Sequence, residues 1–428
     1  MLKKVLNKDV LLKNVFTLVK GTVLAQIISI LAQPVLRRVF TPEDFGVFAL
    51  YIAIVSILSV IATGRFEMAI VLPKKDEEAN LLFKIAIAIA FTFSLLLFII
   101  SFFISDHIIN YILNEELIHA KFKDSYNWLK FSFYMIPIGV FLLSIYNTFN
   151  YWFTRKEKYN KIVNVKIAYS LSNVSSTGAM GFAKLSFGGI VLGYLFSQTL
   201  GVLYFLYLKQ KENIKYAKIE YAALMKNYID FPTKSLLSGL LNILASQLPI
   251  IIIGSFFGMT VVGLYEIIIR ILNIPITMIG KSVSQVFYQK ISKDVNEEKE
   301  IGSYVRSFSI KLFLFMLIPM SVIFFFGESL FAFAFGEQYR ISGNLAAYFS
   351  LFFLIRFVYY SQSTLYSIKR KLGIELKQNA IYLTAQLTAL FVGYYYFDNY
   401  KITFMLLAMS GFLCYLFFVY SLLKLAKS

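Results

Sequence analysis

Long apolar stretches recur along this 428-residue chain, and they constrain its fold more than any other feature. A helix of about 20 apolar residues crosses the roughly 30 Å of hydrocarbon in a bilayer. Hydrophobic residues make up 58% of the chain and charged residues 15%, against about a quarter charged in soluble proteins. The sequence therefore predicts an all-α polytopic membrane protein of about twelve transmembrane helices. We place them at 15–38, 46–72, 81–104, 129–153, 163–182, 188–208, 235–257, 261–288, 310–335, 343–368, 379–397 and 402–424.

The stretch 21–73 predicts two membrane-length helices joined by a tight polar turn. In the turn, Thr41 can cap a helix and Pro42 suits its first position. Acidic residues follow at 43 and 44, where they are favourable at a helix N-terminus. We expect the second helix to continue to Leu72, because proline and a run of charged residues come next.

The same design recurs about 216 residues later, in the apolar stretch 236–257. At this offset, Thr22 and Gln26 correspond to Ser238 and Asn242. Several correspondences at nearly one offset indicate a duplicated half, and many transporters are built from paired repeats. We therefore divide the chain into an N-terminal half, 1–208, a linker, 209–234, and a C-terminal half, 235–428.

Lysine and arginine are distributed unevenly between the two predicted sides of the membrane. One side holds both termini and the loops 73–84, 155–166, 209–234, 290–311 and 369–377, with 29 basic residues, and the other side holds 8. Basic residues mark cytoplasmic loops, so both termini should be cytoplasmic. The same rule accounts for the net charge of +18 without nucleic acid as a partner.

Five of the 42 basic residues are counted on neither side, and all five fall inside predicted spans: Lys20, Arg65, Arg270, Lys281 and Arg356. Each costs roughly 2.5–3.5 kcal/mol at the bilayer centre on insertion scales. Lys20 and Lys281 lie near a cytoplasmic end of their spans. Their side chains could extend to the lipid headgroups there, and this explanation is as good as a functional one. Arg270 and Arg356 lie deeper, and for these two we favour a functional use over a structural ion pair.

A polar stripe follows one face of the span 261–288. Its members fall within about 80° of arc at 100° per residue. Such a stripe faces either a wet cavity or a polar seam with another helix. Because it contains full charges of both signs, we favour the cavity. The stripe consists of Glu266, Arg270, Asn273, Thr277, Lys281, Ser284 and Tyr288.

Other spans carry shorter polar faces. In the second span, Glu67 shares a face with nearby hydroxyl side chains, while Arg65 should point the opposite way, toward the cytoplasmic headgroups. In the tenth, Arg356 aligns with Tyr359 and Tyr360, which would suit sugar rings, although membrane tyrosines more often serve packing or interface anchoring. Further candidates for a cavity wall are Gln26, Asn147 and Asn242.

The residue patterns of soluble enzymes are missing. The sequence has no phosphate-binding glycine loop followed by Lys-Ser/Thr. Its two histidines, His107 and His119, have no metal-ligand spacing, and Cys414 is the one cysteine. We therefore expect no catalytic residues, no metal site and no cofactor, which favours a gradient-driven transporter over an enzyme.

These residues resemble those of the bacterial Wzx-type oligosaccharide flippases, which serve O-antigen and polysaccharide synthesis. The resemblance covers most of the chain and is most specific in the two turn regions. In the first half it is carried by Thr41-Pro42-Glu43-Asp44-Phe45-Gly46, Gly64-Arg65-Phe66-Glu67 and Leu72-Pro73. In the second half it is carried by Asp230-Phe231-Pro232, Gln247-Leu248-Pro249, Gly263-Leu264-Tyr265 and Gln285-Val286-Phe287.

This resemblance implies the fold of the multidrug/oligosaccharidyl-lipid/polysaccharide exporter superfamily. In that fold, two pseudo-symmetric six-helix bundles surround a central cavity that opens by alternating access. The implied substrate is an undecaprenyl-diphosphate-linked oligosaccharide, which is moved from the inner to the outer leaflet of the bacterial cytoplasmic membrane for O-antigen, capsule or lipopolysaccharide synthesis. Membrane lipid and the polysaccharide polymerase machinery would be its partners.

On this interpretation the five basic residues within the spans would bind the diphosphate, which cannot cross hydrocarbon uncompensated. Glu67 and Glu266 would balance excess charge or couple proton or sodium movement. A cation-coupled multidrug antiporter of the same fold is an alternative, although its cavity would need more acidic than basic residues, and here the basic residues outnumber the acids. A membrane glycosyltransferase or polymerase is a further alternative, although such enzymes usually carry catalytic residues on large outer loops.

The predicted orientation can be tested by thiol labelling in a background that carries Cys414→Ser. Cysteines replacing Lys158 and Lys371 should be protected from an impermeant reagent in intact cells with an opened outer membrane, because these sites are predicted to be cytoplasmic. A cysteine replacing Lys123 should react. Labelling at 158 or 371 together with protection at 123 would contradict the orientation.

Overall fold

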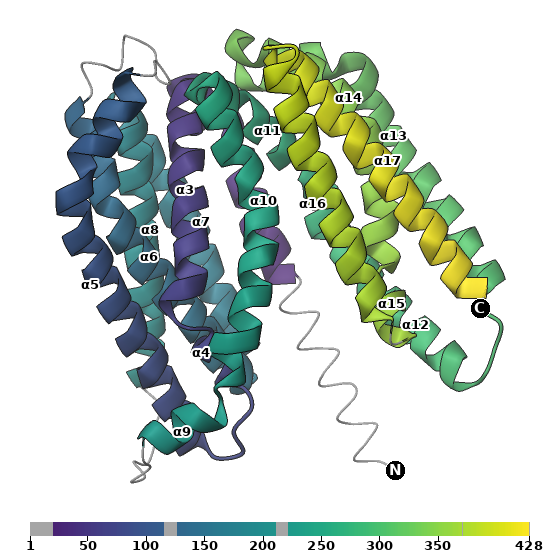
Figure 1. The fold of residues 1–428 in the computed structure, drawn as a ribbon, viewed down its shortest axis with the longest axis horizontal. Coiled ribbons are helices and arrows are strands. Elements are labelled where there is room, and N and C mark those ends of the chain that lie inside the picture. Colours follow the sequence, from purple (N-terminus) through teal and green to yellow (C-terminus); the bar gives the residue numbers. More distant parts are fainter. Residues whose placement is uncertain (1–19, 115–125, 211–220, 370, 428) are drawn as a thin grey trace. The chain divides into compact units, whose positions relative to one another are not determined.

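The computed structural model describes residues 20–114, 126–210, 221–369 and 371–427 (Figure 1). Within these ranges the regular structure is helical and contains no strand, which confirms the all-α prediction. The labelling site at Lys123 lies outside them. The chain divides into two compact units, unit 1 at 1–251 and unit 2 at 252–428. The division of the sequence at a 209–234 linker stays a prediction.

Unit 1 begins with a helix over 20–31, which a turn at Ala32 separates from the first labelled helix. The last helix of the unit, α10, follows a short π-helical turn, η2, and continues past the unit boundary. The elements are α2 (Gln33–Val39), α3 (Pro42–Ala62), α4 (Phe66–Ala69), α5 (Asp76–Asn114), α6 (Tyr126–Arg155), α7 (Tyr159–Phe182), α8 (Ser186–Gln210), α9 (Tyr221–Asn227), η2 (Phe231–Ser235) and α10 (Leu236–Phe257).

Unit 2 contains four long helices and a stretch interrupted by a second π-helical turn, η3. Its elements are α11 (Met259–Pro275), η3 (Ile276–Gly280), α12 (Lys281–Asn296), α13 (Gly302–Phe335), the 3-10 turn η4 (Glu337–Tyr339), α14 (Arg340–Gln362), α15 (Leu365–Ile368), α16 (Leu372–Tyr395) and α17 (Tyr400–Lys427). Helices α13 and α14 cross closely, because a Cβ on Gly327 would lie 2.6 Å from the carbonyl oxygen of Gly343. Small residues allow such close approach between membrane helices.

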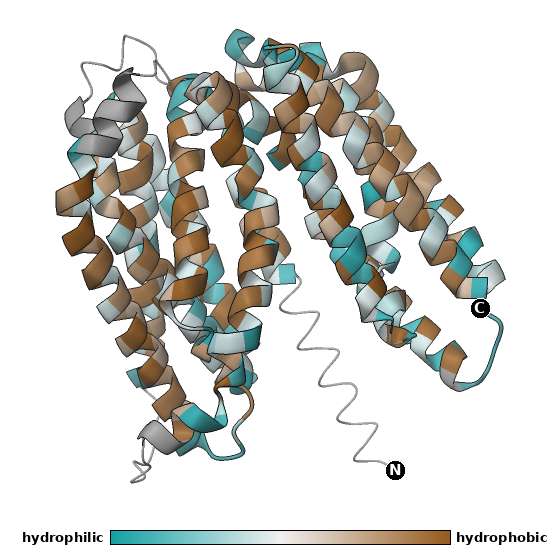
Figure 2. Cartoon of the chain, viewed as in Figure 1, coloured by the Kyte–Doolittle hydropathy of each residue, from teal (hydrophilic) through white to brown (hydrophobic). Residues whose placement is uncertain are grey.

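Ten helices of the described residues are long and apolar enough to cross a membrane. The other two predicted spans, 163–182 and 379–397, lie on α7 and α16. These helices have 24 residues each, which is long enough, but their amide, hydroxyl and charged side chains make them less apolar than the ten. Figure 2 shows the contrast between these helices and the mainly apolar α5. The polar face of a membrane helix must meet other protein or water, and α7 packs against α8 while α16 packs against α17.

The polar turn before α3 forms as predicted. The backbone N–H of Asp44 donates to Thr41 Oγ1 at 3.2 Å, and the backbone N–H of Thr41 donates to Asp44 Oδ2 at 2.9 Å. This reciprocal pair is a capping box, which satisfies two free N–H groups at the helix start. Ser186 donates to the other carboxylate oxygen at 2.5 Å and so connects the turn to α8.

The prediction of one continuous helix over 46–72 is wrong at 63–65. Helix α3 ends at Ala62, and α4 begins only after Gly64 and Arg65, whose φ angles are 56° and 62°. Two successive left-handed residues cannot continue a right-handed helix. Thr63 fixes the break, because its hydroxyl accepts the N–H of Arg65 at 3.3 Å and donates to the Glu67 carboxylate at 2.5 Å.

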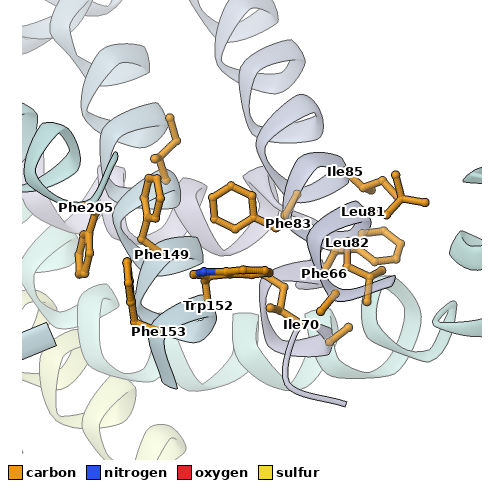
Figure 3. Close-up of a cluster of buried hydrophobic side chains, with 14 of the residues drawn as sticks. Phe66, Ile70, Leu81, Leu82, Phe83, Ile85, Phe149, Trp152, Phe153 and Phe205 are labelled. Atoms are coloured by element: carbon orange, nitrogen blue, oxygen red, sulfur yellow. The ribbon is translucent and has the colours of Figure 1, made fainter. Parts of the chain in front are cut away.

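An aromatic core joins α5, α6 and α8 (Figure 3). Phe149 and Phe205 stack with their ring centroids 5.4 Å apart, and Phe83 meets Trp152 edge-on at 5.6 Å. Trp152 is completely buried. Such pairs contribute about 0.5–1.5 kcal/mol each beyond area burial. These pairs hold the end of α6 in place. Arg155, at this end, makes hydrogen bonds that require such a fixed position.

Arg155, the last residue of α6, binds the segment that leads from α4 to α5. Its Nη1 donates to the carbonyl oxygens of Ile70 and Val71 at 3.3 Å each and of Pro73 at 2.5 Å. Its Nε and Nη2 donate to Asp76 Oδ1 at 3.2 and 3.1 Å. The Arg155 side chain is only 10% exposed. One guanidinium therefore satisfies carbonyl groups that the broken helix leaves without partners.

Arg155→Met should lower the free energy of unfolding by about 1–3 kcal/mol, because it leaves these carbonyl groups unsatisfied. Lys156→Met is the matched control, since Lys156 pairs with the same Asp76 carboxylate but contacts none of the carbonyls. The control should change stability by only about 0–1 kcal/mol, as for other exposed ion pairs. Thermal unfolding of the purified protein in detergent measures both. Equal losses of stability in the two variants would show that the ion pair with Asp76 contributes and the carbonyl contacts do not.

Candidate functional site

The predicted polar stripe lies on α11, η3 and α12, on the side that unit 2 leaves uncovered. Ile267, Ile268 and Leu272 are completely buried on the opposite, apolar face of α11. Arg270, Thr277 and Lys281 are exposed, and Glu266 and Asn273 are half-buried. Ser284, farther along the stripe on α12, is buried, so the part of the stripe that the described helices of unit 2 leave open runs from Glu266 to Lys281. A charged face at membrane depth that its own unit leaves open must meet water or other protein.

Glu266 and Arg270 form the contact that their spacing predicts. Nε of Arg270 donates to Oε1 of Glu266 at 2.5 Å. The Glu266 side chain is 13% exposed and that of Arg270 is 41% exposed. A guanidinium carries five N–H donors, and the carboxylate engages it through Nε. The terminal nitrogens of Arg270 can therefore bind a second anion from the exposed side.

The stripe passes through η3, which follows Pro275. Proline has no N–H to donate to the preceding turn, and π-helical turns occur often at functional sites. Thr277 donates to the carbonyl oxygens of Asn273 and Ile274 at 3.2 and 3.1 Å. A Cβ on Gly280 would lie 3.2 Å from the ring of Tyr360, so α14 packs directly against the end of this turn.

Arg356 projects from the middle of α14 into a group of aromatic rings. Its guanidinium carbon lies 5.2 Å from the ring centroid of Phe353, 5.7 Å from Phe352 and 5.9 Å from Tyr415. It is half-buried, and within the described part of the chain no carboxylate forms an ion pair with it. Ring faces stabilise a cation only partly. Arg356 therefore remains able to bind an anion.

The two tyrosines after Arg356 have different surroundings. Tyr360 is 40% exposed. Tyr359 is buried in a hydrophobic cluster, and its hydroxyl donates to Gln378 Oε1 at 2.8 Å. Gln378 in turn donates to the hydroxyl of Tyr366 at 2.9 Å. Tyr360 is thus placed to meet a ligand, whereas the position of Tyr359 supports a packing role between α14 and α16.

The prediction that Arg65 points away from Glu67 is wrong. The left-handed turn brings Nη1 of Arg65 within 3.7 Å of Glu67 Oε1. Glu67 is only 5% exposed. The Arg65 guanidinium lies against α10, where a Cβ on Gly239 would be 2.8–3.0 Å from it. Nε of Arg65 is buried and has no hydrogen-bond partner among the described residues.

The remaining candidates lie separately in unit 1. Lys20 and the amide side chains of Asn147 and Asn242 are exposed. Gln26 is half-buried, and its Oε1 is buried without a hydrogen-bond partner in the described residues. Their role as ligand contacts stays a prediction.

Two basic residues within helices of membrane length were not among the sequence candidates: Arg37, which is completely buried in α2, and Lys166. Lys166 was counted with the loop 155–166, but it lies in the second turn of α7. Its Nζ donates to Thr22 Oγ1 in the first helix at 3.2 Å. The signal was present in the sequence, because Lys166 falls inside the predicted span 163–182.

The chain is similar in fold to solved structures of transporters. The chain is similar to a multidrug resistance transporter of the MATE family in its inward-facing conformation, with a TM-score of 0.70 and 13% identity over 94% of this chain and 96% of that one. It is also similar to the lipid II flippase MurJ in its inward closed conformation, with a TM-score of 0.70 and 15% identity over 94% of this chain and 87% of that one. It is also similar to a MOP superfamily transporter from Pyrococcus furiosus Vc1 (DSM3638), with a TM-score of 0.57 and 15% identity over 97% of this chain and 96% of that one.

At these identities the similarity defines the fold, which is that of the multidrug/oligosaccharidyl-lipid/polysaccharide exporter superfamily. A family model described as polysaccharide biosynthesis protein matches residues 35–343. The chain belongs to this family. The teichuronic acid biosynthesis protein TuaB of Bacillus subtilis (strain 168) is 26% identical over 211 residues. That alignment spans 48% of this chain and 40% of the relative.

Accessibility of the stripe can be tested with cysteines in the Cys414→Ser background. Cysteines replacing Asn273 and Thr277 should react with a small water-soluble thiol reagent, because unit 2 leaves this face open. Cysteines replacing Ile268 and Leu272 should not, because both side chains are completely buried. Equal reactivity of the two pairs would contradict the assignment of the stripe to a wet surface.

Proposed function

We propose that this protein is a flippase that moves an undecaprenyl-diphosphate-linked oligosaccharide from the inner to the outer leaflet of the bacterial cytoplasmic membrane. One observation carries the proposal: a row of cationic and polar side chains at membrane depth, which its own unit leaves uncovered. In a polysaccharide biosynthesis family with an exporter fold, such a row suits an anionic, sugar-bearing lipid. The prenyl tail would stay in the hydrocarbon throughout.

The lipid headgroup has to be compensated while it crosses, since burying an uncompensated charge is prohibitive. Arg270 suits the diphosphate, because a planar guanidinium can donate two parallel hydrogen bonds to phosphate oxygens. Arg356 would add a second positive charge from α14, with aromatic rings rather than an acid beside it. Lys281 and Lys20, both exposed, would act as further point charges nearer the cytoplasmic end.

Glu266 gives the site a resting state. In the empty protein it pairs with Arg270 and reduces the cost of holding that charge in the membrane. An arriving diphosphate would compete with Glu266 for the guanidinium. The displaced carboxylate could then take up a proton or a sodium ion, which would couple transport to a gradient. Glu67, buried beside Arg65 in unit 1, would be a second acid that balances a membrane charge.

The sugars need donors and acceptors together with ring faces. Tyr360 offers an exposed aromatic ring, and Asn273 an amide on the stripe. Asn147, Asn242 and Gln26 offer amides in unit 1. Alternating access would present these groups first to the cytoplasm and then to the outside. The polysaccharide polymerase machinery would be the partner that receives the sugar chain.

Arg270 variants test the headgroup site. Arg270→Ala should abolish polysaccharide export with the protein still in the membrane. Arg270→Lys should be impaired about tenfold or more but active, because it keeps the charge and loses the fork; hydrogen bonds to charged groups contribute about 1.5–3 kcal/mol. Glu266→Gln should preserve binding and change the pH dependence of transport. Immunoblotting of membranes and of surface polysaccharide measures the effects of the Arg270 variants, and transport in liposomes over a range of pH checks Glu266→Gln.

The matched control is Lys290→Ala, which removes an exposed i,i+4 pair with Asp294 on α12. It should export normally, because exposed pairs contribute little. The swapped double variant Glu266→Arg with Arg270→Glu keeps the ion pair but moves the cation. Full export by this variant, or by Arg270→Ala, would reduce Arg270 to a structural role.

A further inference from the structure

The short helix α9 lies at the end of unit 1 where several membrane-length helices begin or end. The candidate span before it ends at Gln210, and the one after it begins at Phe231. The span of α5 begins at Asp76, and α9 packs against α5. Figure 1 shows α9 lying across the direction of these long helices. Spans begin and end at the boundary between hydrocarbon and water, so α9 lies at that boundary.

One side of α9 is packed into unit 1. Leu224 is 4% exposed and belongs to the same hydrophobic cluster as Phe66 and Leu82. Tyr228, in the turn that follows α9, packs against this cluster as well. Leu224 and Tyr228 are four residues apart, so they lie on one face of the helical turn. This packed face holds α9 on unit 1.

A second side of α9 is apolar and exposed. Tyr221, Met225 and Ile229 are spaced by four residues and are 56%, 37% and 52% exposed. Ile229 continues the helical turn, because its N–H donates to the carbonyl oxygen of Lys226 at 3.4 Å. At 100° per residue the three side chains cover about 80° of arc directly beside the packed face. These three residues form the apolar row of α9.

The third side of α9 is polar. Lys226 is exposed and lies about 180° from the packed face, so it points away from unit 1. The apolar row lies between these two sides, on the flank of the helix. Such a division of packed, apolar and charged sides is typical of a helix that lies in the plane of a membrane surface. The flank then contacts lipid, and the charged side contacts water.

Apolar exposure continues from the row into a membrane span. The next large apolar side chains that are exposed along the chain are Leu237 and Leu241. Both stand in the first two turns of α10, a helix of membrane length. Apolar surface is unfavourable in water by roughly 25 cal/mol per Å² and is not penalised in hydrocarbon. Lipid is therefore the occupant that suits a row placed at the boundary and joined to a span.

We propose that the apolar row of α9 is a lipid-binding surface. Its three side chains lie among the acyl chains just below the headgroups, and Lys226 faces water. The lysine count predicts that this is the inner leaflet. The row anchors the segment between the last span of the first half and the first span of the second half to the membrane surface. This inference does not depend on the molecule that the protein carries.

Spin labels on two neighbouring residues test the proposal. Met225→Cys and Lys226→Cys, each in the full-length chain with Cys414→Ser, would carry a nitroxide in liposomes of phosphatidylethanolamine and phosphatidylglycerol. Oxygen concentrates in hydrocarbon and a nickel chelate in water, so the ratio of their collision rates with the label reports depth. This ratio should be about threefold or more higher at 225 than at 226, because only the row contacts lipid.

Two exposed positions of unit 1 calibrate the measurement. Leu96→Cys, within the span of α5, gives the ratio expected in a span, and Lys74→Cys, just before α5, gives the ratio expected in water. An aqueous ratio at both 225 and 226 would overturn the proposal. Low collision rates with both reagents at 225 would also overturn it, because protein would then cover the row in place of lipid.

A second pair of variants tests whether the row holds the segment in the lipid. Met225→Asp should lower the collision ratio of a label on Ile229→Cys about threefold, because a charge is costly among acyl chains. Lys226→Asp is the matched control, since it changes charge on the side that faces water, and it should leave the ratio at 229 unchanged. Both variants keep Leu224 and Tyr228 on the packed face. An unchanged ratio at 229 in Met225→Asp would contradict the anchor.

Discussion

A charge at the depth of the hydrocarbon has to be compensated, and much of this structure follows from that constraint. Three membrane-depth arginines meet it in different ways. Arg270 pairs with Glu266, Arg65 lies near Glu67, and Arg356 has aromatic rings and no described acid. The compensation is incomplete in each case. Nε of Arg65 has no described partner, and Arg270 is largely exposed. Incomplete compensation is what a site for a transient anion requires.

The same constraint explains where the helices are interrupted. The break at 63–65 turns Arg65 back toward Glu67, and η3 lies within the polar stripe. Both irregular segments lie beside charged side chains, although Arg270 and Arg356 themselves stand on the regular helices α11 and α14.

Much of the fold could be predicted from the sequence, because hydrocarbon permits few solutions. Apolar length and helical period predicted the spans, the capped turn at Thr41, the Glu266–Arg270 contact and the open face of α11. The misses have different causes. Helical-wheel reasoning assumes a uniform rotation, so it placed Arg65 opposite Glu67, and it gave no sign that Tyr359 is enclosed by α16. Lys166 was missed because it was counted with a loop near a boundary.

The central claim is that this chain moves a diphosphate-linked oligosaccharide across a bilayer. The most direct test is reconstitution of the purified protein in liposomes with a fluorescent polyprenyl-diphosphate oligosaccharide in the inner leaflet, followed by a membrane-impermeant quencher or glycosidase outside. The account predicts that the sugar becomes accessible from outside, faster than in protein-free liposomes, with its glycosidic and diphosphate bonds intact. Cleavage or extension of the sugar, or no gain in accessibility, would contradict it.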